Sequence, residues 1–266
     1  MFKQHFGMKS NPFGKEISST DLYAGNDLKE LKSRLKYMLE NRGIFLLVGE
    51  PGSGKTTALR DFADGLGPSL FKLVYISLTT VTVNDFYSEL ASALGEQPKY
   101  RKIDMFNQIQ AAISNLYFEQ RVTPVIIADE MHMASTSILD DIRMLFNFRM
   151  DSINPFVLVI AAQPHIRNKL ALNICLPLKQ RIAAKYSMKG LSEPETHEYI
   201  KSRMQIAGVV RDVFTQQAIT QIHSSSNGFP RNINNIVTAC FMYCKWKNLD
   251  MVDEEVVYQA NIELAV

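Results

Sequence analysis

The chain contains Gly49-Glu50-Pro51-Gly52-Ser53-Gly54-Lys55-Thr56, a stretch that fits the pattern G-x-x-x-x-G-K-[ST]. The apolar run Ile44–Val48 precedes it, and Thr56–Gly65, which has helical periodicity, follows it. The glycines let the backbone curve closely around phosphate groups and point N–H groups at them, and the helix N-terminus adds its dipole. By chance, the pattern is expected in about one chain in a hundred of this length. The sequence therefore predicts a nucleotide-phosphate loop that extends to Thr57, with Lys55 on the β- and γ-phosphates and Thr56 Oγ1 on Mg²⁺.

Four short apolar runs predict buried strands. They are rich in Val, Ile and Leu without alternation, as in a parallel sheet covered on both faces. The runs are Ile44–Val48, Leu73–Ile76, Val125–Ala128 and Phe156–Ala161. Segments with helical periodicity separate or follow them, at Thr56–Gly65, Asn84–Leu94, Met105–Gln120 and Ser137–Phe148. This alternation predicts an α/β fold with right-handed crossovers.

After Gly190 only helical patterns follow. Ser192-Glu193-Pro194-Glu195 predicts a capping box at a helix start, and Thr215 predicts the cap of the next helix. Two further helices are expected over Asn232–Lys247 and Asp253–Ala265. We therefore expect an α/β core over residues 1–190 and a small all-helical lid over residues 191–266, without a Gly/Ser-rich linker between them.

Asp129 and Glu130 directly follow the predicted strand Val125–Ala128. Ligands of open α/β sheets bind at the carboxyl ends of the strands, so both carboxylates are expected beside the phosphate loop. Asp129 is expected to orient Mg²⁺, and Glu130 to polarise an attacking water. A small-molecule kinase must exclude water, so Glu130 favours hydrolysis. His132 has no Ser or Cys nucleophile motif beside it, and we expect it next to the site or at a contact with a neighbour.

The composition is that of an ordinary globular protein. Its 266 residues include 29 Lys+Arg and 27 Asp+Glu, a net charge of +2, and 46% of them are hydrophobic. These values exclude wholesale disorder and require any nucleic-acid contact to come from a local cluster of cations. The cysteines, Cys175, Cys240 and Cys244, cannot all pair, and apolar neighbours of the last two favour packing over a metal site. With no signal-peptide pattern and no membrane span, we expect a cytoplasmic protein without a membrane partner.

These motifs together resemble the AAA+ ATPases, and within them the general secretion pathway protein A and transposition-helper (Mu B-like and TniB-like) type. The resemblance covers nearly the whole chain, and several motifs in the family's order are more specific than any one alone. Besides the loop and the acidic pair, it rests on Phe6-Gly7, Asn11-Pro12-Phe13, Ile142–Phe148, Ala162-Gln163-Pro164, Gln180-Arg181-Ile182, Tyr199-Ile200 and Gly228–Asn234. It implies a P-loop NTPase fold, a parallel sheet flanked by helices and followed by a lid, with ATP and Mg²⁺ as cofactors and ATP hydrolysis as the reaction.

The resemblance also implies roles for residues outside the loop. Pro12 and Phe13 look like part of an N-terminal segment, residues 1–40, that covers the adenine. Gln163 looks like sensor 1, which contacts the γ-phosphate or the attacking water. The family usually has glycine where this chain has Ala162, a departure directly beside the sensor.

Two arginines complete the implied site. Arg181 resembles the arginine finger, which reaches into a neighbouring subunit's site and stabilises charge in the transition state. Arg231 resembles sensor 2, which couples the lid to the phosphates; on the residues alone, an exposed arginine at a helix start also fits. If Arg181 acts in trans, the active unit is an ATP-dependent homo-oligomer, either a closed ring or an open filament.

Lys99-Tyr100-Arg101-Lys102 is the sharpest basic cluster. Cations with an interleaved aromatic residue suit the backbone and bases of nucleic acid. Transposition-helper ATPases that resemble this chain line a DNA-facing surface with the loops after the second strand, here Thr79–Asn84 and Lys99–Lys102. We therefore predict contacts with double-stranded DNA by Thr80, Lys99, Arg101 and Lys102, although a solvated basic loop explains the cluster equally well.

Two functions follow from the resemblance. The first is a regulator of DNA transposition that oligomerises on duplex DNA and recruits or activates a transposase. The second is an ATPase that energises assembly of an envelope secretion or pilus system. Secretion members that resemble this chain continue into a membrane span and a cell-wall-binding domain, whereas this sequence stops at Val266, which favours the first function. Glu130 and the two arginines disfavour a P-loop kinase or a plain nucleotide-gated adaptor.

Overall fold

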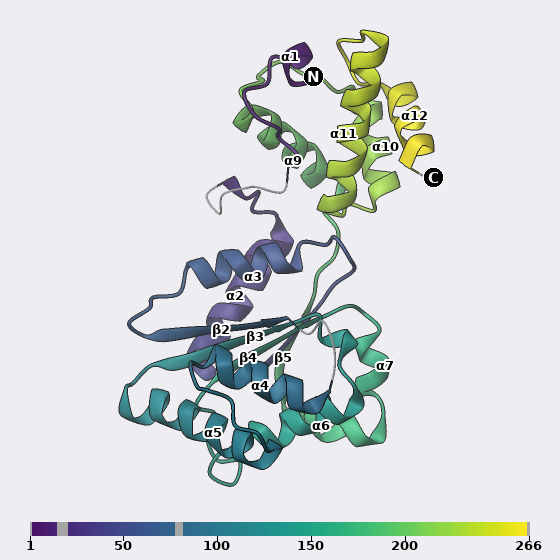
Figure 1. Cartoon of the computed structure of the whole chain (residues 1–266). Helices are drawn as coiled ribbons and strands as arrows, with labels where there is room; N and C mark the ends of the chain where they lie inside the picture. The colour runs from purple at the N-terminus through teal and green to yellow at the C-terminus, as the bar shows by residue number, and fades with distance from the viewer. Residues whose placement is uncertain (1, 15–20, 78–81, 265–266) are drawn as a thin grey trace. The chain divides into compact units, whose positions relative to one another are not determined.

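The computed structural model describes residues 2–14, 21–77 and 82–264 (Figure 1). The chain divides into two compact units. The first, called the α/β unit, comprises Glu30–Pro51 and Lys55–Met188. The second, called the helical unit, comprises Met1–Lys29, Gly52–Gly54 and Lys189–Val266. Each unit has its own hydrophobic core.

The α/β unit is built on a five-stranded sheet with the order β2-β3-β4-β1-β5. Its strands are β1 (Gly43–Val48), β2 (Phe71–Ser77), β3 (Thr123–Asp129), β4 (Val157–Ala162) and β5 (Ile182–Ser187). Every neighbouring pair is parallel. The carboxyl ends of all five strands therefore lie on the same side of the sheet, and the chain segments that follow β1, β3 and β4 meet there. The predicted parallel α/β fold is confirmed.

Helices cover both faces of this sheet, with α2 and α3 on one face and α4, α5 and α6 on the other (Figure 1). They are α2 (Asn26–Asn41), α3 (Lys55–Asp64), α4 (Val83–Ala93), α5 (Lys102–Ser114) and α6 (Thr136–Leu145). A π-helical turn, Asn115–Glu119, extends α5, and two short helices, α7 (Ile166–Leu170) and α8 (Leu176–Arg181), follow β4. β1, β3 and β4 are buried almost throughout because both faces are covered, which is why their sequences are continuous apolar runs.

β5 is absent from the four strands that the apolar runs predict. This strand pairs with β1 and is the last strand in the sheet order. Of its residues only Tyr186 is buried, so the sequence Ile182-Ala183-Ala184-Lys185-Tyr186-Ser187 needs no continuous apolar run. An edge strand with a half-exposed surface lacks the pattern that marks the central strands.

The helical unit contains α1 (Phe2–Phe6), α9 (Glu193–Ile206), α10 (Gln216–Ser226), α11 (Pro230–Lys247) and α12 (Glu254–Leu264). The predicted capping box is present: Ser192 Oγ accepts from Glu195 N, and the Glu195 carboxylate accepts from Ser192 N. Thr215 Oγ1 likewise accepts from Ala218 N at the start of α10. These local signals set the helix starts that the sequence predicted.

The sequence placed residues 1–40 in the α/β core, but the described residues up to Lys29 belong to the helical unit, and the α/β unit begins at Glu30. Phe6, Met8 and Phe13 are buried in the hydrophobic core of the helical unit. The backbone N–H of Lys9 also donates to Ala207 O at 2.9 Å. Burial of three large apolar side chains explains why this segment packs with α9 and α11 despite its distance in sequence.

Cys175, Cys240 and Cys244 are buried free thiols, as apolar packing predicts. Burial raises the pKa of Cys240 and Cys244, which keeps both thiols protonated. Among the described residues, no helix is both long and apolar enough to cross a membrane.

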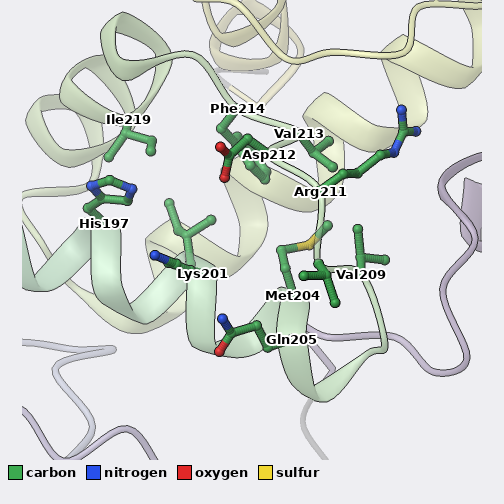
Figure 2. A pocket seen from close by; sticks show the side chains of 12 residues that line it. His197, Lys201, Met204, Gln205, Val209, Arg211, Asp212, Val213, Phe214 and Ile219 are labelled. Carbon is green, nitrogen blue, oxygen red and sulfur yellow. The ribbon is translucent and has the colours of Figure 1, made fainter.

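Figure 2 presents a cavity within the helical unit, between α9 and the segment that leads to α10. Its volume is about 40 Å³, and its lining includes His197, Lys201, Arg211 and Asp212. A water molecule requires at least about 10–15 Å³, so the cavity has room for a few waters.

Candidate nucleotide site

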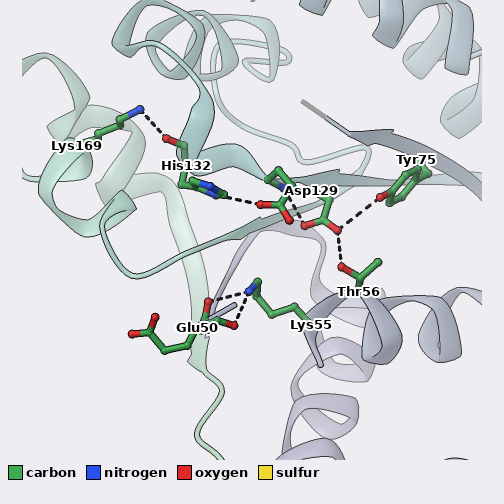
Figure 3. A network of polar contacts seen from close by, with 9 residues as sticks. Glu50, Lys55, Thr56, Tyr75, Asp129, His132 and Lys169 are labelled. Carbon is green, nitrogen blue, oxygen red and sulfur yellow. Dashed lines mark hydrogen bonds and ion pairs between the residues drawn. The ribbon is translucent and has the colours of Figure 1, made fainter. Parts of the chain in front are cut away.

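The predicted phosphate loop connects β1 to α3. Gly52 and Gly54 have φ values of 81° and 94°, a left-handed conformation that only glycine adopts without strain. Lys55, the first residue of α3, is buried, and its Nζ donates to the carbonyl oxygens of Gly49 at 2.7 Å and Glu50 at 3.1 Å (Figure 3). The loop therefore curves around the ammonium group of Lys55, as a phosphate-binding loop requires.

Asp129 links the end of β3 to the start of α3. Its carboxylate is buried, with Oδ2 accepting from Thr56 Oγ1 at 2.9 Å and Oδ1 from Glu130 N at 2.8 Å (Figure 3). The hydroxyl of Tyr75 on β2 lies at 3.5 Å from Oδ2, a long contact. Burial and the charge of Asp129 raise the pKa of Tyr75, so the phenol stays protonated. A hydroxyl and a carboxylate this close form the oxygen-donor set that Mg²⁺ prefers.

Glu130 extends from the same strand end in a left-handed conformation, with φ 55° and ψ 29°. Its side chain is 44% exposed, and its Oε2 lies 3.3 Å from Nδ1 of the buried His132. The acidic pair is thus split between two environments. Asp129 is enclosed and bonded to the phosphate loop, whereas Glu130 reaches solvent, from which an attacking water would come.

Gln163 follows β4, the strand between β1 and β3. The N–H of Gly49 donates to the carbonyl oxygen of Ala162 at 3.1 Å, which ties the start of the loop to the residue before Gln163. The topology therefore brings Gln163 to the carboxyl edge of the sheet, between the phosphate loop and Asp129.

A sequence model of the family described as AAA domain matches residues 38–170, half of the chain. The chain belongs to the AAA+ ATPases. General secretion pathway protein A of Aeromonas hydrophila is 31% identical over 242 residues, which cover 89% of this chain and 43% of that protein. The chain therefore spans less than half the length of this relative.

Solved structures of other AAA+ proteins share the fold. Cdc6p from Pyrobaculum aerophilum matches with a TM-score of 0.70 and 16% identity, covering 95% of this chain and 70% of that chain. A chain of Drosophila ORC bound to DNA matches with a TM-score of 0.71 and 15% identity, covering 100% of this chain and 66% of that one. At these identities the likeness concerns the fold alone.

Arg231 lies in the first turn of α11 in this AAA+ protein, after Pro230. Its backbone N–H donates to Gly52 O at 3.3 Å, a contact within the helical unit. A Cβ added at Gly52 would lie 2.9 Å from the Cβ of Arg231, closer than real Cβ atoms approach other atoms. Gly52 therefore serves two purposes, a left-handed turn and close contact with Arg231.

Arg181 lies at the amino ends of the parallel strands, whereas the phosphate loop lies at their carboxyl ends. It ends α8 just before Ile182, which pairs with Ile44 near the start of β1, whereas the loop follows Val48 at the end of β1. At about 3.3 Å per residue, roughly 13 Å separate these positions along the strand. The α/β unit does not bring Arg181 to its own phosphate loop.

Pro12 and Phe13 are both buried. The ring of Phe13 packs against Phe241 at 6.0 Å and Tyr199 at 6.5 Å between centroids, within the helical unit. The predicted adenine-covering role of Pro12 and Phe13 stays a prediction, and the structure adds that Phe13 is also part of a hydrophobic core.

The residues predicted to contact DNA do not form a single free cluster. Lys102 Nζ pairs with the buried Asp141 at 2.7 Å, and Arg101 Nε pairs with Asp104 at 2.7 Å. Lys99 lines a cavity of about 380 Å³ together with Lys72, Leu94, Glu96, Gln108, Ala111, Ala112, Asn115, Leu116 and Gln120. Thr80 lies outside the described residues. Two of the three described cations are therefore paired within their own subunit.

Two residues beside the acidic pair carry no signal that the sequence motifs contain. Tyr75 reaches Asp129 from β2, which pairs with β3 in the sheet. Lys169 of α7 donates to the carbonyl oxygens of His132 at 2.6 Å and Ala134 at 2.7 Å, a tertiary contact without any motif. Of the two positions that the sequence left open for His132, the structure gives the one beside the site.

Proposed function

We propose that the protein binds ATP with Mg²⁺ and hydrolyses it to ADP and phosphate. The observation that carries this proposal is the convergence of Lys55, Thr56, Asp129, Glu130 and Gln163 at one edge of the sheet. The donor set fits Mg²⁺, because Thr56 Oγ1 and the Asp129 carboxylate are hard oxygen ligands 2.9 Å apart. Bound Mg²⁺ supplies charge neutralisation on the triphosphate.

Each residue has a chemical task in this proposal. Gly49–Thr57 bind the phosphates, and Lys55 balances the charge that builds up on the γ-phosphate. Glu130 accepts the proton of the attacking water, whose oxygen forms the new bond to the γ-phosphorus, while the bridging oxygen departs with ADP. Gln163 orients the water or the γ-phosphate, and Arg231 couples the helical unit to the phosphates.

The proposal includes assembly with further copies of the chain. Because Arg181 lies at the edge of the sheet opposite the phosphate loop, its proposed role as an arginine finger requires a second subunit. A contact between two different faces of identical subunits closes into a ring or continues as a filament. ATP hydrolysis would then depend on protein concentration.

For the client of this ATPase, two proposals stand side by side. A role in envelope secretion or pilus assembly is supported by the 31% identity to general secretion pathway protein A. A role as a regulator of DNA transposition, with duplex DNA and a transposase as partners, is supported by the sequence resemblance and by Tyr100, which is 97% exposed beside Lys99. Both roles imply a location in the cytoplasm, where ATP is available.

The test of the ATPase compares the purified chain with Lys55→Ala and Glu130→Gln. Lys55→Ala is expected to lose nucleotide binding, whereas Glu130→Gln is expected to bind ATP and lose hydrolysis. Phosphate release with and without Mg²⁺ and nucleotide binding by fluorescence measure the two properties separately. Full hydrolysis by Glu130→Gln would contradict the assignment of the base.

A further inference from the structure

His132 is a buried histidine two residues after the proposed base. It is 6% exposed, and its Nδ1 lies 3.3 Å from Glu130 Oε2 (Figure 3). Its ring meets the ring of His165 edge to face, with 4.7 Å between centroids. The proposed hydrolytic mechanism assigns His132 no task, although its imidazole lies beside the proposed base.

The backbone around His132 is fixed from two sides. The turn Met131–Met133 is a single 3₁₀ turn that begins directly after Glu130. Lys169 Nζ donates to the carbonyl oxygens of His132 and Ala134 at 2.6 Å and 2.7 Å. These two hydrogen bonds hold the backbone of the turn against α7, and the imidazole of His132 is itself buried.

Glu130, in contrast, has little that fixes its side chain. It is a non-glycine residue in the left-handed region, a conformation that costs about 1–2 kcal/mol. Its side chain is 44% exposed, and an exposed carboxylate samples several rotamers unless a partner selects one. A general base requires a fixed distance to the water that it deprotonates.

The His132 imidazole can supply the missing constraint. Burial is the largest cause of its lowered pKa; Lys55, Lys169 and His165 also lower it, and Glu130 raises it. A neutral imidazole carries one N–H. Nδ1 is buried and forms no hydrogen bond with the described residues, and Glu130 Oε2 lies 3.3 Å from it, so a proton on Nδ1 has this carboxylate oxygen within reach. The other oxygen of Glu130 then remains available for the water.

We propose that His132 is a positioning residue that holds the Glu130 carboxylate in the orientation needed to accept a proton from the attacking water. The inference rests on the proposed function of Glu130. It assigns the contact between Nδ1 and Oε2 a role in the rate of hydrolysis and none in nucleotide affinity.

Two amide substitutions separate this role from simple core packing. His132→Asn places its amide nitrogen near the position of Nδ1, whereas His132→Gln places it near Nε2. We expect His132→Asn to keep kcat within about threefold of the unmodified protein, and His132→Gln and His132→Ala to lose tenfold or more, as an order of magnitude for a misplaced base. The KM for ATP and the fluorescence-measured nucleotide affinity should change less than about twofold in all three. His197→Gln, in the helical unit, is the matched control and should change neither.

Several outcomes would overturn the inference. Equal kcat for His132→Asn and His132→Gln would mean that the position of the donor does not matter. A rise in KM at unchanged kcat would assign His132 to nucleotide binding instead. If His132→Ala fails to fold, the two isosteric amide variants still decide the question, with thermal unfolding as the check on each.

A double substitution distinguishes failure of this inference from failure of the proposed function. In a Glu130→Gln background, His132→Ala should cause no further loss of hydrolysis, because its effect passes through Glu130. Full activity of Glu130→Gln would contradict the proposed function itself. If Glu130→Gln loses hydrolysis as expected but His132→Gln hydrolyses ATP at the full rate, the inference about His132 is wrong and the proposed function still holds.

Discussion

Arg181 is held by Asp151: its Nη2 lies 2.6 Å from Asp151 Oδ1, while its Nη1 donates to the carbonyl oxygen of Arg143 at 2.6 Å. Both contacts are made within the α/β unit, at the edge of the sheet opposite the phosphate loop. The guanidinium has five N–H groups, so these bonds leave others available to a neighbouring subunit. This geometry suits an arginine that acts on a site other than its own.

Arg181→Ala is expected to bind ATP normally and to lose hydrolysis by roughly 10³-fold or more, the usual scale for an arginine finger. Mixing provides the decisive measurement. A Glu130→Gln subunit has an intact Arg181, and an Arg181→Ala subunit has an intact Glu130, so mixed assemblies should recover part of the phosphate release. No recovery in mixtures that are seen to co-assemble would argue against action in trans.

The loop that presents Asp151 is strained, and this leads to a prediction about stability. Arg149, Met150 and Asp151 have φ values of 46°, 55° and 66°, three consecutive left-handed residues without a glycine. Met150 is 98% exposed and has no core contact to lose. Met150→Gly should therefore raise the free energy of unfolding by up to about 1 kcal/mol, measured by urea unfolding.

Lys36→Gly is the control for that measurement. Lys36 is exposed in the interior of α2, where its backbone is helical. There glycine should lower the free energy of unfolding by about 1 kcal/mol. If both glycine substitutions destabilise the protein equally, the strain assigned to Met150 is wrong.

The sequence predicted those parts of the site whose residues are neighbours in the chain. The phosphate loop and the Asp129-Glu130 pair are contiguous motifs, and the apolar runs before them indicated that strands carry both. By contrast, Asp151 meets Arg181 across a separation of thirty residues, as their numbers show. No motif marks a left-handed run without glycine such as the one that presents Asp151.

The features that the sequence pattern does not contain have physical causes as well. β5 lies at the sheet edge and buries one residue, so its sequence is not a continuous apolar run. Lys102 and Arg101 look like free cations in the sequence, but their partners, Asp141 and Asp104, neutralise them in the fold. Pairing with Asp141 depends on how α5 packs on α6, which a one-dimensional charge pattern does not contain.

Gly52→Ala tests the close contact between the phosphate loop and Arg231. Alanine there must adopt a φ near 81° and would bring its Cβ to 2.9 Å from the Cβ of Arg231. We expect nucleotide affinity to fall by roughly tenfold or more, about 1.4 kcal/mol, because the loop must distort. Equilibrium binding of a fluorescent ATP analogue measures the change.

Gly67→Ala is the matched control for that substitution. A Cβ at Gly67 meets nothing within 4 Å, and its backbone is not left-handed. Alanine should leave nucleotide affinity unchanged at this position. Wild-type affinity in Gly52→Ala would show that the loop can rearrange freely around Arg231.

The basic segment around Tyr100 gives the prediction that separates the two proposed clients. Lys102 is committed to the buried Asp141, so Lys102→Met should lower the free energy of unfolding by about 1–3 kcal/mol and is unsuited to a DNA test. Lys99→Ala with Tyr100→Ala removes an exposed aromatic and a cation without breaking that pair. In a transposition regulator, duplex DNA should stimulate ATP hydrolysis, and this double variant should reduce the stimulation and flatten its salt dependence by about one unit of slope. In a secretion ATPase, duplex DNA at low salt should not stimulate ATP hydrolysis by the unmodified chain or by the double variant, because Tyr100 then contacts a partner other than DNA.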